Sequence, residues 1–246
     1  MSELAGRRAL VTGASRGIGA AIALALAERG ADVAITYERS AERAAEVVRA
    51  IEARGRRGVA IQADSADAAA VKHSVDAAVA ELGGLDILVN NAGIARGGPV
   101  SEMPLADIDA LLAVNVRAVV LASQAAIPHL GEGGRIVSIG SSLGERVPFA
   151  GVTVYSMTKS ALLSLTRGLA RELGPQGITV NLVQPGSTDT DMNPSDGAQS
   201  DTQRAMTALG HYGRPEDIAA AVAFLASPAA RQITGTTLTV DGGANA

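Results

Sequence analysis

The sequence predicts a single α/β domain, residues 1–246, built on a Rossmann-type doubly wound parallel sheet of about seven strands with helices on both faces. Short runs of β-branched and aliphatic residues alternate with longer Ala-rich stretches along the whole chain. These runs are apolar almost without interruption, which is typical of parallel strands buried on both faces. No linker or change in composition divides the 246 residues, and open α/β sheets often reach this size as one domain.

In the first half of the chain, each apolar run precedes one amphipathic stretch. β-Branched runs predict strands, which we expect at 7–11 (with its edge at Thr12), 32–36, 58–62 and 86–90. Apolar residues with a period near 3.6 predict the helices between them, at about 17–29, 40–54 and 67–82. Ser40 and Asp67 stand at the start of two of these helices, where such residues favour a cap.

The second half continues the alternation, with one exception. Strands are expected at 135–139, 178–183 and 237–240, and helices at about 104–128, 153–173 and 215–226. The segment 186–211 is polar, turn-rich and too long for an ordinary connection. We expect about 187–210 to form a substrate lid, with a disordered surface insertion as the alternative.

Charge and composition exclude several classes of protein. The net charge is −4 and the isoelectric point is near 5.4, so neither nucleic acid nor a membrane is expected as a partner. The absence of cysteine excludes thiol nucleophiles and zinc–thiolate sites. Because no signal-peptide stretch or run of about 18 apolar residues is evident, a cytoplasmic location is expected.

A glycine-rich turn joins the first strand to the first helix. Gly13, Gly17 and Gly19 lie there, where backbone N–H groups and the helix dipole attract an anion and glycine permits the close approach of a pyrophosphate. The spacing is G-x-x-x-G-x-G and not the G-x-G-x-x-G fingerprint, so a turn without a ligand stays open as an alternative.

The end of the second strand indicates which dinucleotide is preferred. An acid at this point would bind the ribose 2′-hydroxyl of NAD, but Tyr37 occupies it, with Arg16 and Arg39 in reach of a 2′-phosphate. NADP(H) is therefore favoured over NAD(H). Glu38 would reverse this preference if the strand ended one residue later.

Tyr155 and Lys159 are four residues apart near the start of a predicted helix, so both point to one face. Lys159 is one of two lysines among 21 cationic residues. A cation about 4 Å away contributes roughly 4 kcal/mol, and lowering the pKa of a phenol by about two units needs only about 2.7 kcal/mol. The pair is thus a candidate acid/base site, although a solvated helix face would have the same spacing.

Seven short motifs occur in a fixed order along the chain. They are T-G-A-S-R-G-I-G at 12–19, N-N-A-G at 90–93, Asn115, Ser142 thirteen residues before Tyr155, Y-S-M-T-K at 155–159, N-x-V-x-P-G at 181–186 and T-V-D-G-G at 239–243. Over essentially its whole length the chain resembles the short-chain dehydrogenase/reductases, and among them the ketoreductases similar to 3-oxoacyl carrier-protein reductases.

This resemblance implies a role for each matching residue. Tyr155 would protonate the carbonyl oxygen, Ser142 would orient that oxygen, Lys159 would lower the pKa of Tyr155 and bind the nicotinamide ribose, and no metal is required. Asn115 would bind a water of the proton relay, with a helix-kinking core amide as the alternative. The implied cofactor-binding residues are Gly13, Ser15, Arg16, Gly17, Ile18, Gly19, Tyr37, Arg39, Asp64, Ser65, Asn91, Ala92, Gly93, Tyr155, Lys159, Pro185, Gly186, Thr188 and Thr190.

The expected activity is hydride transfer between NADPH and a ketone or secondary alcohol. A nucleotide-binding regulator that does not turn over is the alternative on the same fold. G-x-S-x-G at 140–144 also matches a hydrolase nucleophile elbow, with His211 later in the chain, but GERVPFAG after it indicates a loop where an elbow needs a helix.

The substrate is less well defined by the sequence. Where carrier-protein reductases would carry basic residues toward an acidic carrier, this chain has Glu132 and Gln176, which favours a free carbonyl compound or a small 3-oxoacyl ester. The resemblance also implies a homotetramer that uses the helices near 104–128 and 153–173 and the last strand. Expected pocket walls are Ile94, Leu143, Val147, Phe149, Val152 and part of 187–210.

Overall fold

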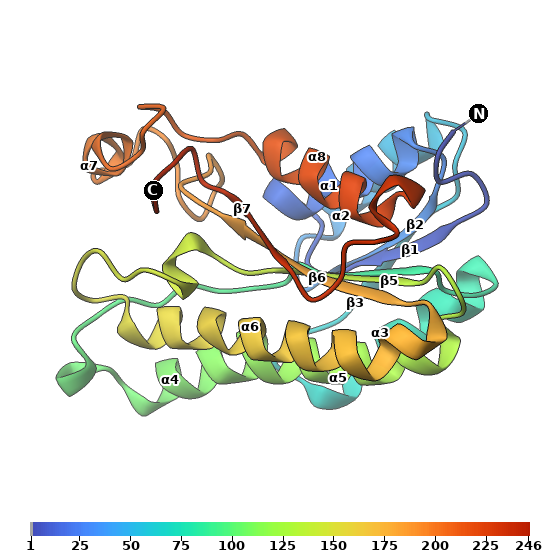
Figure 1. Ribbon diagram of the computed structural model, residues 1–246, viewed down its shortest axis with the longest axis horizontal. Coiled ribbons are helices and arrows are strands. Elements are labelled where there is room, and N and C mark those ends of the chain that lie inside the picture. Colours follow the sequence, from blue (N-terminus) through green and yellow to red (C-terminus); the bar gives the residue numbers. More distant parts are fainter. Residues whose placement is uncertain (1) are drawn as a thin grey trace.

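A computed structural model describes residues 2–246 and contains one sheet of seven parallel strands between two layers of helices (Figure 1). The strand order is β3-β2-β1-β4-β5-β6-β7. The strands are β1 (Arg8–Val11), β2 (Asp32–Tyr37), β3 (Gly58–Gln62), β4 (Ile87–Asn90), β5 (Arg135–Ile139), β6 (Thr179–Pro185) and β7 (Thr237–Val240). The order reverses between β1 and β4, and ligands of open α/β sheets bind at such a switch point, beyond the carboxyl ends of the strands. The predicted fold class is confirmed.

Helices cover both faces of the sheet (Figure 1). One layer contains α1 (Gly17–Glu28), α2 (Ala41–Glu52) and α8 (Pro215–Ala226), with α1 packed on α8. The other contains α3 (Ala68–Leu82), α4 (Leu105–Leu112), α5 (Ala118–Ala126) and α6 (Thr153–Leu173). Successive residues of β2 enter opposite cores, Val33 and Ile35 on one side and Ala34 on the other, which explains the unbroken apolar runs.

The helix expected over 104–128 is interrupted. A π-helical turn, Ala113–Arg117, separates α4 from α5 and carries the fully buried Asn115. Single π-helical turns inside α-helices occur frequently at functional sites. Asn115 is thus placed by a local departure from the α-helix, a feature that apolar periodicity does not reveal.

The same helical run, Leu105–His129, is long and apolar enough to cross a membrane by length and composition. Its buried residues include Leu111, Ala118 and Ala122, and the latter two belong to the core on the α3 and α5 side of the sheet. The apolar character of this run is therefore that of a core helix.

The segment 186–211 is more ordered than a disordered insertion would be. It contains a short helix, α7 (Ser200–Ala205), which the sequence analysis did not predict. Gln203 of this helix accepts a hydrogen bond from Ser187 at 2.6 Å and exchanges two with Asn193 at 2.9 and 3.1 Å. These contacts fold the segment back on itself beside the carboxyl end of β6.

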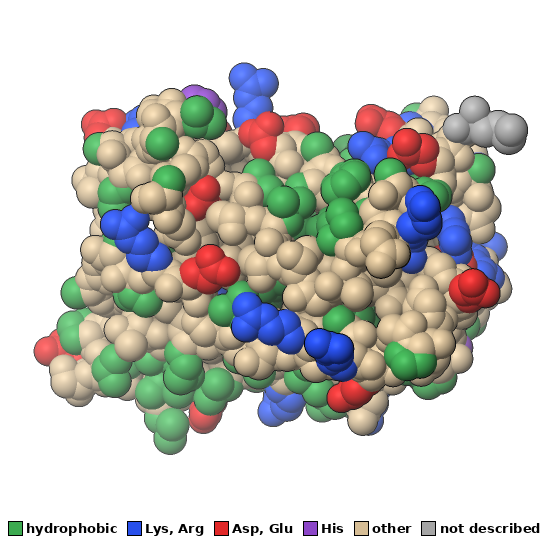
Figure 2. All heavy atoms as spheres, in the orientation of Figure 1, with side chains coloured by type: hydrophobic (Ala, Val, Ile, Leu, Met, Phe, Trp, Pro, Cys, Tyr) green, Lys and Arg blue, Asp and Glu red, His purple; other side chains and the backbone are tan. Residues whose placement is uncertain are grey.

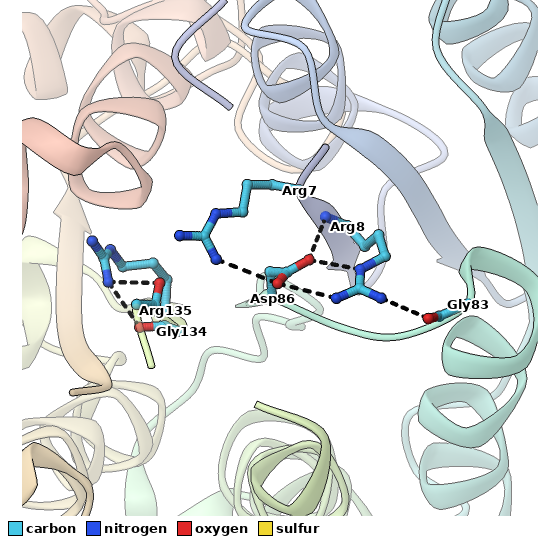
Figure 3. A network of polar contacts seen from close by, with 7 residues as sticks. Arg7, Arg8, Gly83, Asp86, Gly134 and Arg135 are labelled. Atoms are coloured by element: carbon cyan, nitrogen blue, oxygen red, sulfur yellow. Dashed lines mark hydrogen bonds and ion pairs between the residues drawn. The ribbon is translucent and has the colours of Figure 1, made fainter. Parts of the chain in front are cut away.

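An arginine–aspartate network joins the opposite, amino-terminal ends of β1 and β4 (Figure 3). Asp86 accepts the backbone N–H of Arg8 at 2.9 Å and its Nε–H at 2.7 Å, and Arg7 adds a bond at 3.3 Å. Burial raises the pKa of the Asp86 carboxyl, but the hydrogen bonds and charges of the two arginines outweigh this and hold it below its usual range. Nearby, the buried Arg135 donates to the carbonyls of the two glycines that precede it.

Candidate active site

The glycine-rich turn at the end of β1 packs tightly against the segment that follows β4. A Cβ added to Gly13, whose φ is +63°, would lie 2.8 Å from the Cα of Ala92, and one at Gly19 would lie 2.4 Å from Nδ2 of Asn91. Asn91 donates through that nitrogen to the carbonyl oxygen of Gly13 at 3.0 Å. Glycine is required here because the space a side chain would need is occupied by the N-N-A-G segment.

The start of α1 is open to an anion. Arg16 occupies the N-cap position, and its side chain makes no capping hydrogen bond to the first turn. Helix-start N–H groups without an internal partner attract negative charge. Ser15, Gly17 and Ile18 are part of this turn, so the structure places the predicted pyrophosphate site at the switch point of the sheet.

Strand β2 ends at Tyr37, one residue beyond the predicted range of 32–36, and Arg39 follows it. Glu38 pairs with Arg39 at 2.7 Å, and both side chains are largely in solvent. A further arginine, Arg43 in the first turn of α2, was missed by the sequence analysis. Arg39 precedes this helix, so no helical spacing in the sequence indicated Arg43.

Asp64 and Ser65, the predicted adenine contacts, follow β3. Asp64 accepts a hydrogen bond from the backbone of Ala66 at 2.8 Å, which shapes the turn between β3 and α3. Ser65 lines a small cavity together with Ala92 and Thr12. The structure thus brings the residues after β1, β3 and β4 together.

Tyr155 and Lys159 lie in the first two turns of α6, facing the same region. The Lys159 ammonium is buried, donates to the carbonyl oxygen of Ile139 at 3.0 Å and lies 5.9 Å from the centre of the Tyr155 ring. Burial lowers the pKa of Lys159 to about 8. Burial also raises the pKa of the Tyr155 phenol above its usual value, opposed by a hydrogen bond with Ser141. The pKa of the phenol is therefore shifted upward, opposite to the lowering that we expected from Lys159.

Ser141, the neighbour of the predicted Ser142, is the side chain whose hydrogen bonding opposes the rise that burial causes in the pKa of the Tyr155 phenol. Ser141 precedes a 3-10 turn, Ser142–Gly144, and also accepts a hydrogen bond from the N–H of Leu143 at 3.2 Å. Ser142 is the next residue, and its backbone carbonyl is bound by the side chain of Asn245 at 2.8 Å. The role of Ser142 stays a prediction, and Ser141 is a second candidate for the hydroxyl that orients the carbonyl oxygen.

Asn115 joins three parts of the site. Its side chain accepts from the N–H of Ile94 and donates to the carbonyl of the same residue, both at 2.9 Å, and donates to Thr158 of α6 at 3.1 Å. A Cβ at Gly93 would lie 3.3 Å from Nζ of Lys159 and 3.4 Å from Oδ1 of Asn115. The side-chain bonds match the core-amide alternative, and the relay role stays a prediction.

The segment after β6 closes the other side of the site. Pro185 ends β6, and a Cβ at Gly186 would lie 2.6 Å from the Cα of Asp241. Thr188 donates to the carbonyl of Gly186 at 3.1 Å. The methyl group of Thr190 would lie 3.4 Å from a Cβ at Gly17. The start of the predicted lid therefore reaches the glycine-rich turn across the site.

The predicted substrate wall is partly open. Val147 is 53% exposed and Phe149 is 38% exposed, in the loop between Ser141 and α6. A backbone hydrogen bond of 2.8 Å from Gly98 to Gly151 ties this loop to the residues after Ile94. The loop that precedes α6 thus presents apolar side chains on its surface. Leu143 and Val152 begin and end the same loop.

The hydrolase alternative has no support in this geometry. A 3-10 turn and a loop follow Ser142 in place of the helix that a nucleophile elbow requires. Nδ1 of His211 lies 2.9 Å from the carbonyl oxygen of Tyr212 and is engaged there.

Comparisons with known proteins show the family of the chain. A family model described as enoyl-(acyl carrier protein) reductase matches residues 13–245. The chain is 44% identical to the cyclic-di-GMP-binding biofilm dispersal mediator protein of Escherichia coli, covering 98% of each chain. It is 43% identical to the 3-oxoacyl-(acyl-carrier-protein) reductase FabG of Staphylococcus aureus, covering 96% of this chain and 97% of that protein.

A solved short-chain dehydrogenase from Burkholderia cenocepacia, in complex with NADP, superimposes with a TM-score of 0.98 at 65% identity. The match covers 99% of this chain and 100% of that one. The ordered motifs, the seven-stranded sheet and these matches lead to one conclusion: the chain belongs to the short-chain dehydrogenase/reductase family.

Proposed function

We propose that the protein is an NADPH-dependent carbonyl reductase, which in reverse oxidises secondary alcohols. The observation that carries this proposal is the buried Lys159 ammonium 5.9 Å from the centre of the Tyr155 ring, with Ser141 as the side chain that opposes the effect of burial on the pKa of the phenol. A protein that only binds a nucleotide has no need of these three groups in this arrangement.

The chemistry follows from the positions of the side chains. NADPH, when bound, supplies the hydride, and the protein supplies orientation and protons. Tyr155 donates its phenolic proton to the carbonyl oxygen, and Ser141 donates a hydrogen bond that polarises the same oxygen. Lys159 stabilises the phenolate left behind and is placed, beside Gly93, to donate to ribose hydroxyls.

The chain fits NADPH at both ends of the molecule. The packed glycine turn leaves room for a pyrophosphate at the start of α1, and Arg16 and Arg39 stand near the end of β2 for the 2′-phosphate. Asp64, Ser65 and 91–93 would hold the adenosine, and 185–190 the carboxamide. The NADP in the Burkholderia cenocepacia structure supports the same preference.

The substrate proposed is a free ketone, an aldehyde or a small 3-oxoacyl ester. Val147 and Phe149 present apolar surface on the loop that precedes α6, the helix that carries Tyr155. Glu132 is next to the loop that contains Gln176. A Cβ added to Gly177 in this loop would lie 2.9 Å from the Cγ of Glu132. An acidic carrier protein would meet a carboxylate and an amide here, which opposes docking.

A regulator is the second candidate, because one relative is named for binding cyclic di-GMP. In that case the chain would bind nucleotides without turnover. A panel of ketones and aldehydes with NADPH separates the two functions, and a titration with cyclic di-GMP tests the regulator directly. Turnover without binding of cyclic di-GMP supports the reductase, and the converse supports the regulator.

We also propose a homotetramer. Figure 2 shows hydrophobic side chains gathered over α4 at the lower left, and Leu105 (71%), Val120 (41%) and Met157 (50%) are exposed on α4, α5 and α6. A groove also runs between α5 and α6, lined by Val120, Ser123, Gln124, Ile127, Pro128, Leu165, Leu169 and Glu172. Light scattering on Val120→Asp and on the unchanged protein tests whether this face carries the subunit contact.

Titration with NADPH and NADH tests the cofactor assignment. Fluorescence is expected to show tighter binding of NADPH, because three arginines lie near the 2′-phosphate site. Preferred binding of NADH would contradict the assignment and would point to Glu38 as a ribose ligand.

A further inference from the structure

One carboxylate joins two cations across the mouth of the proposed cofactor site. Oδ2 of Asp191, in the predicted lid, lies 3.1 Å from Nη1 of Arg16 and 2.6 Å from Nη1 of Arg43. All three side chains are more than half exposed, at 55, 58 and 53%. Asp191 thus connects the lid to the start of α1 and to the first turn of α2.

The cluster lies where the adenosine end of a dinucleotide would bind. Arg16 is the N-cap of α1, and Thr190, the neighbour of Asp191, contacts the glycine turn at Gly17. Arg43 lies in the first turn of α2, which begins at Ala41, and Arg39 precedes this helix. Both Arg16 and Arg43 are occupied by Asp191, whereas Arg39 is paired with Glu38.

The charges at this point are unequal. Two guanidinium groups share the carboxylate of Asp191, so Arg16, Arg43 and Asp191 together carry one net positive charge. Arg43 and Arg16 together hold the pKa of Asp191 below its usual range, so its carboxylate is ionised at neutral pH. A phosphate dianion that reached these arginines would have to compete with this fixed negative charge.

Resting on the proposed function, we propose that Arg43 is a ligand of the 2′-phosphate of NADPH, and that Asp191 is the internal anion which this phosphate displaces from Arg16 and Arg43. Exposed carboxylate–guanidinium pairs are weak, and a phosphate makes stronger charge-assisted bonds to the same groups, so the exchange is favourable. NADH carries no 2′-phosphate and leaves the pairs of Asp191 intact. Asp191 therefore limits the affinity for NADPH, and Arg43 contributes to the selection of NADPH over NADH.

The test measures dissociation constants for NADPH, NADH and 2′,5′-ADP by fluorescence or calorimetry. The variants are Asp191→Asn, Arg43→Gln and their double variant. Asp201→Asn is the matched control, because Asp201 lies in the same segment, is 99% exposed and pairs with Arg204. The probe 2′,5′-ADP carries the phosphate without a nicotinamide, so it isolates this end of the site.

Asp191→Asn is expected to lower the dissociation constants of NADPH and 2′,5′-ADP roughly three- to tenfold, because it removes one like charge near the phosphate at the surface. The dissociation constant of NADH and those of the control variant should not change. Arg43→Gln is expected to weaken NADPH and 2′,5′-ADP about tenfold with little effect on NADH. In the double variant, the gain from Asp191→Asn shrinks because one of its two cations is gone.

Equal changes in the dissociation constants of NADPH and NADH in either variant would overturn the inference. Asp191 would then serve only to hold the lid in place. A gain of affinity in the Asp201→Asn control of the same size would also overturn it, because a general charge effect would then explain the result. If the unchanged protein binds neither dinucleotide, the proposed function fails together with the inference. If the protein binds NADPH and turns over normally but the variants leave the dissociation constants unchanged, only the inference about Arg43 and Asp191 is wrong.

Discussion

Ser141 opposes the rise that burial causes in the pKa of the Tyr155 phenol, while Ser142 beside it is bound through its backbone carbonyl to Asn245 at 2.8 Å. The two serines can therefore be separated by experiment. Ser141 holds its hydroxyl at the point where a carbonyl oxygen would meet Tyr155. Ser142 contributes to the position of the loop.

Ser141→Ala is expected to lower kcat about a hundredfold or more, because one donor to the developing negative charge is lost. Ser142→Ala is the matched control and is expected to keep activity within a few-fold of the unchanged protein. Steady-state kinetics on both variants gives the answer. If Ser142→Ala lost more activity than Ser141→Ala, Ser142 would be the serine that orients the carbonyl oxygen, as predicted from the sequence.

The amine of Lys159, which we propose to be catalytic, lowers the stability of the folded protein. Its folded-state pKa of about 8 is below the ordinary value of 10.5, so the charged amine destabilises the fold below pH 8, and this penalty disappears as the pH rises from about 8 to 10.5. Lys159→Met is expected to raise the free energy of unfolding at pH 7 by about 1–2 kcal/mol, the desolvation penalty less one hydrogen bond to Ile139.

Urea unfolding at pH 7 and pH 10 measures this effect. The stability difference between Lys159→Met and the unchanged protein should shrink toward pH 10, while the activity of the variant is lost at both values. Lys159→Arg tests the other property of the amine, because it keeps the charge but cannot copy a compact point donor. If Lys159→Arg retained full activity, the amine would have no specific function.

Asp86 contributes to the stability of the fold in a way that depends on pH in the acid range. Its pKa is lowered in the folded protein, so its contribution is complete above the ordinary carboxyl pKa and is lost as the pH falls through the folded-state value. Asp86→Asn is expected to cost about 1–3 kcal/mol at pH 7, because Arg8 loses a charged acceptor. The difference from the unchanged protein should narrow below pH 4. A constant difference down to pH 2 would contradict this role.

The sheet was predictable because burial on both faces dictates the composition of its strands. β3, β5 and β7 begin and end at the predicted residues, and so do α6 and α8. The other strands differ at their ends by one or two residues. α1 and α2 end earlier than predicted because helix ends depend on caps and local hydrogen bonds, which periodicity does not encode.

The site was less predictable where it depends on irregular backbone. The choice between Ser141 and Ser142 depends on the path of 145–152, a loop without periodicity. The π-helical turn at Asn115 follows from contacts with Ile94 and Thr158, which are distant in sequence. Arg43 and Asp191 meet across 148 residues, and no local pattern indicates such a pair.

The contacts between the carboxyl-terminal residues and the loop after β5 could also not be predicted from the sequence. Asn245 binds the carbonyl of Ser142, and Arg146 donates to the carbonyl of Ala244 at 3.1 Å. The last residues thus brace the loop that carries Ser141. This contact joins residues about a hundred positions apart and follows only from the fold.

The central claim is that Tyr155 transfers a proton during NADPH-dependent reduction of a carbonyl compound. Its most direct test is the rate of NADPH oxidation with a panel of ketones and aldehydes, measured for the unchanged protein and for Tyr155→Phe at matched NADPH saturation. We predict turnover by the unchanged protein, and in Tyr155→Phe a loss of about a thousandfold or more with NADPH binding preserved. Equal rates in the two proteins, or bound NADPH that no carbonyl compound oxidises in either, would contradict the account.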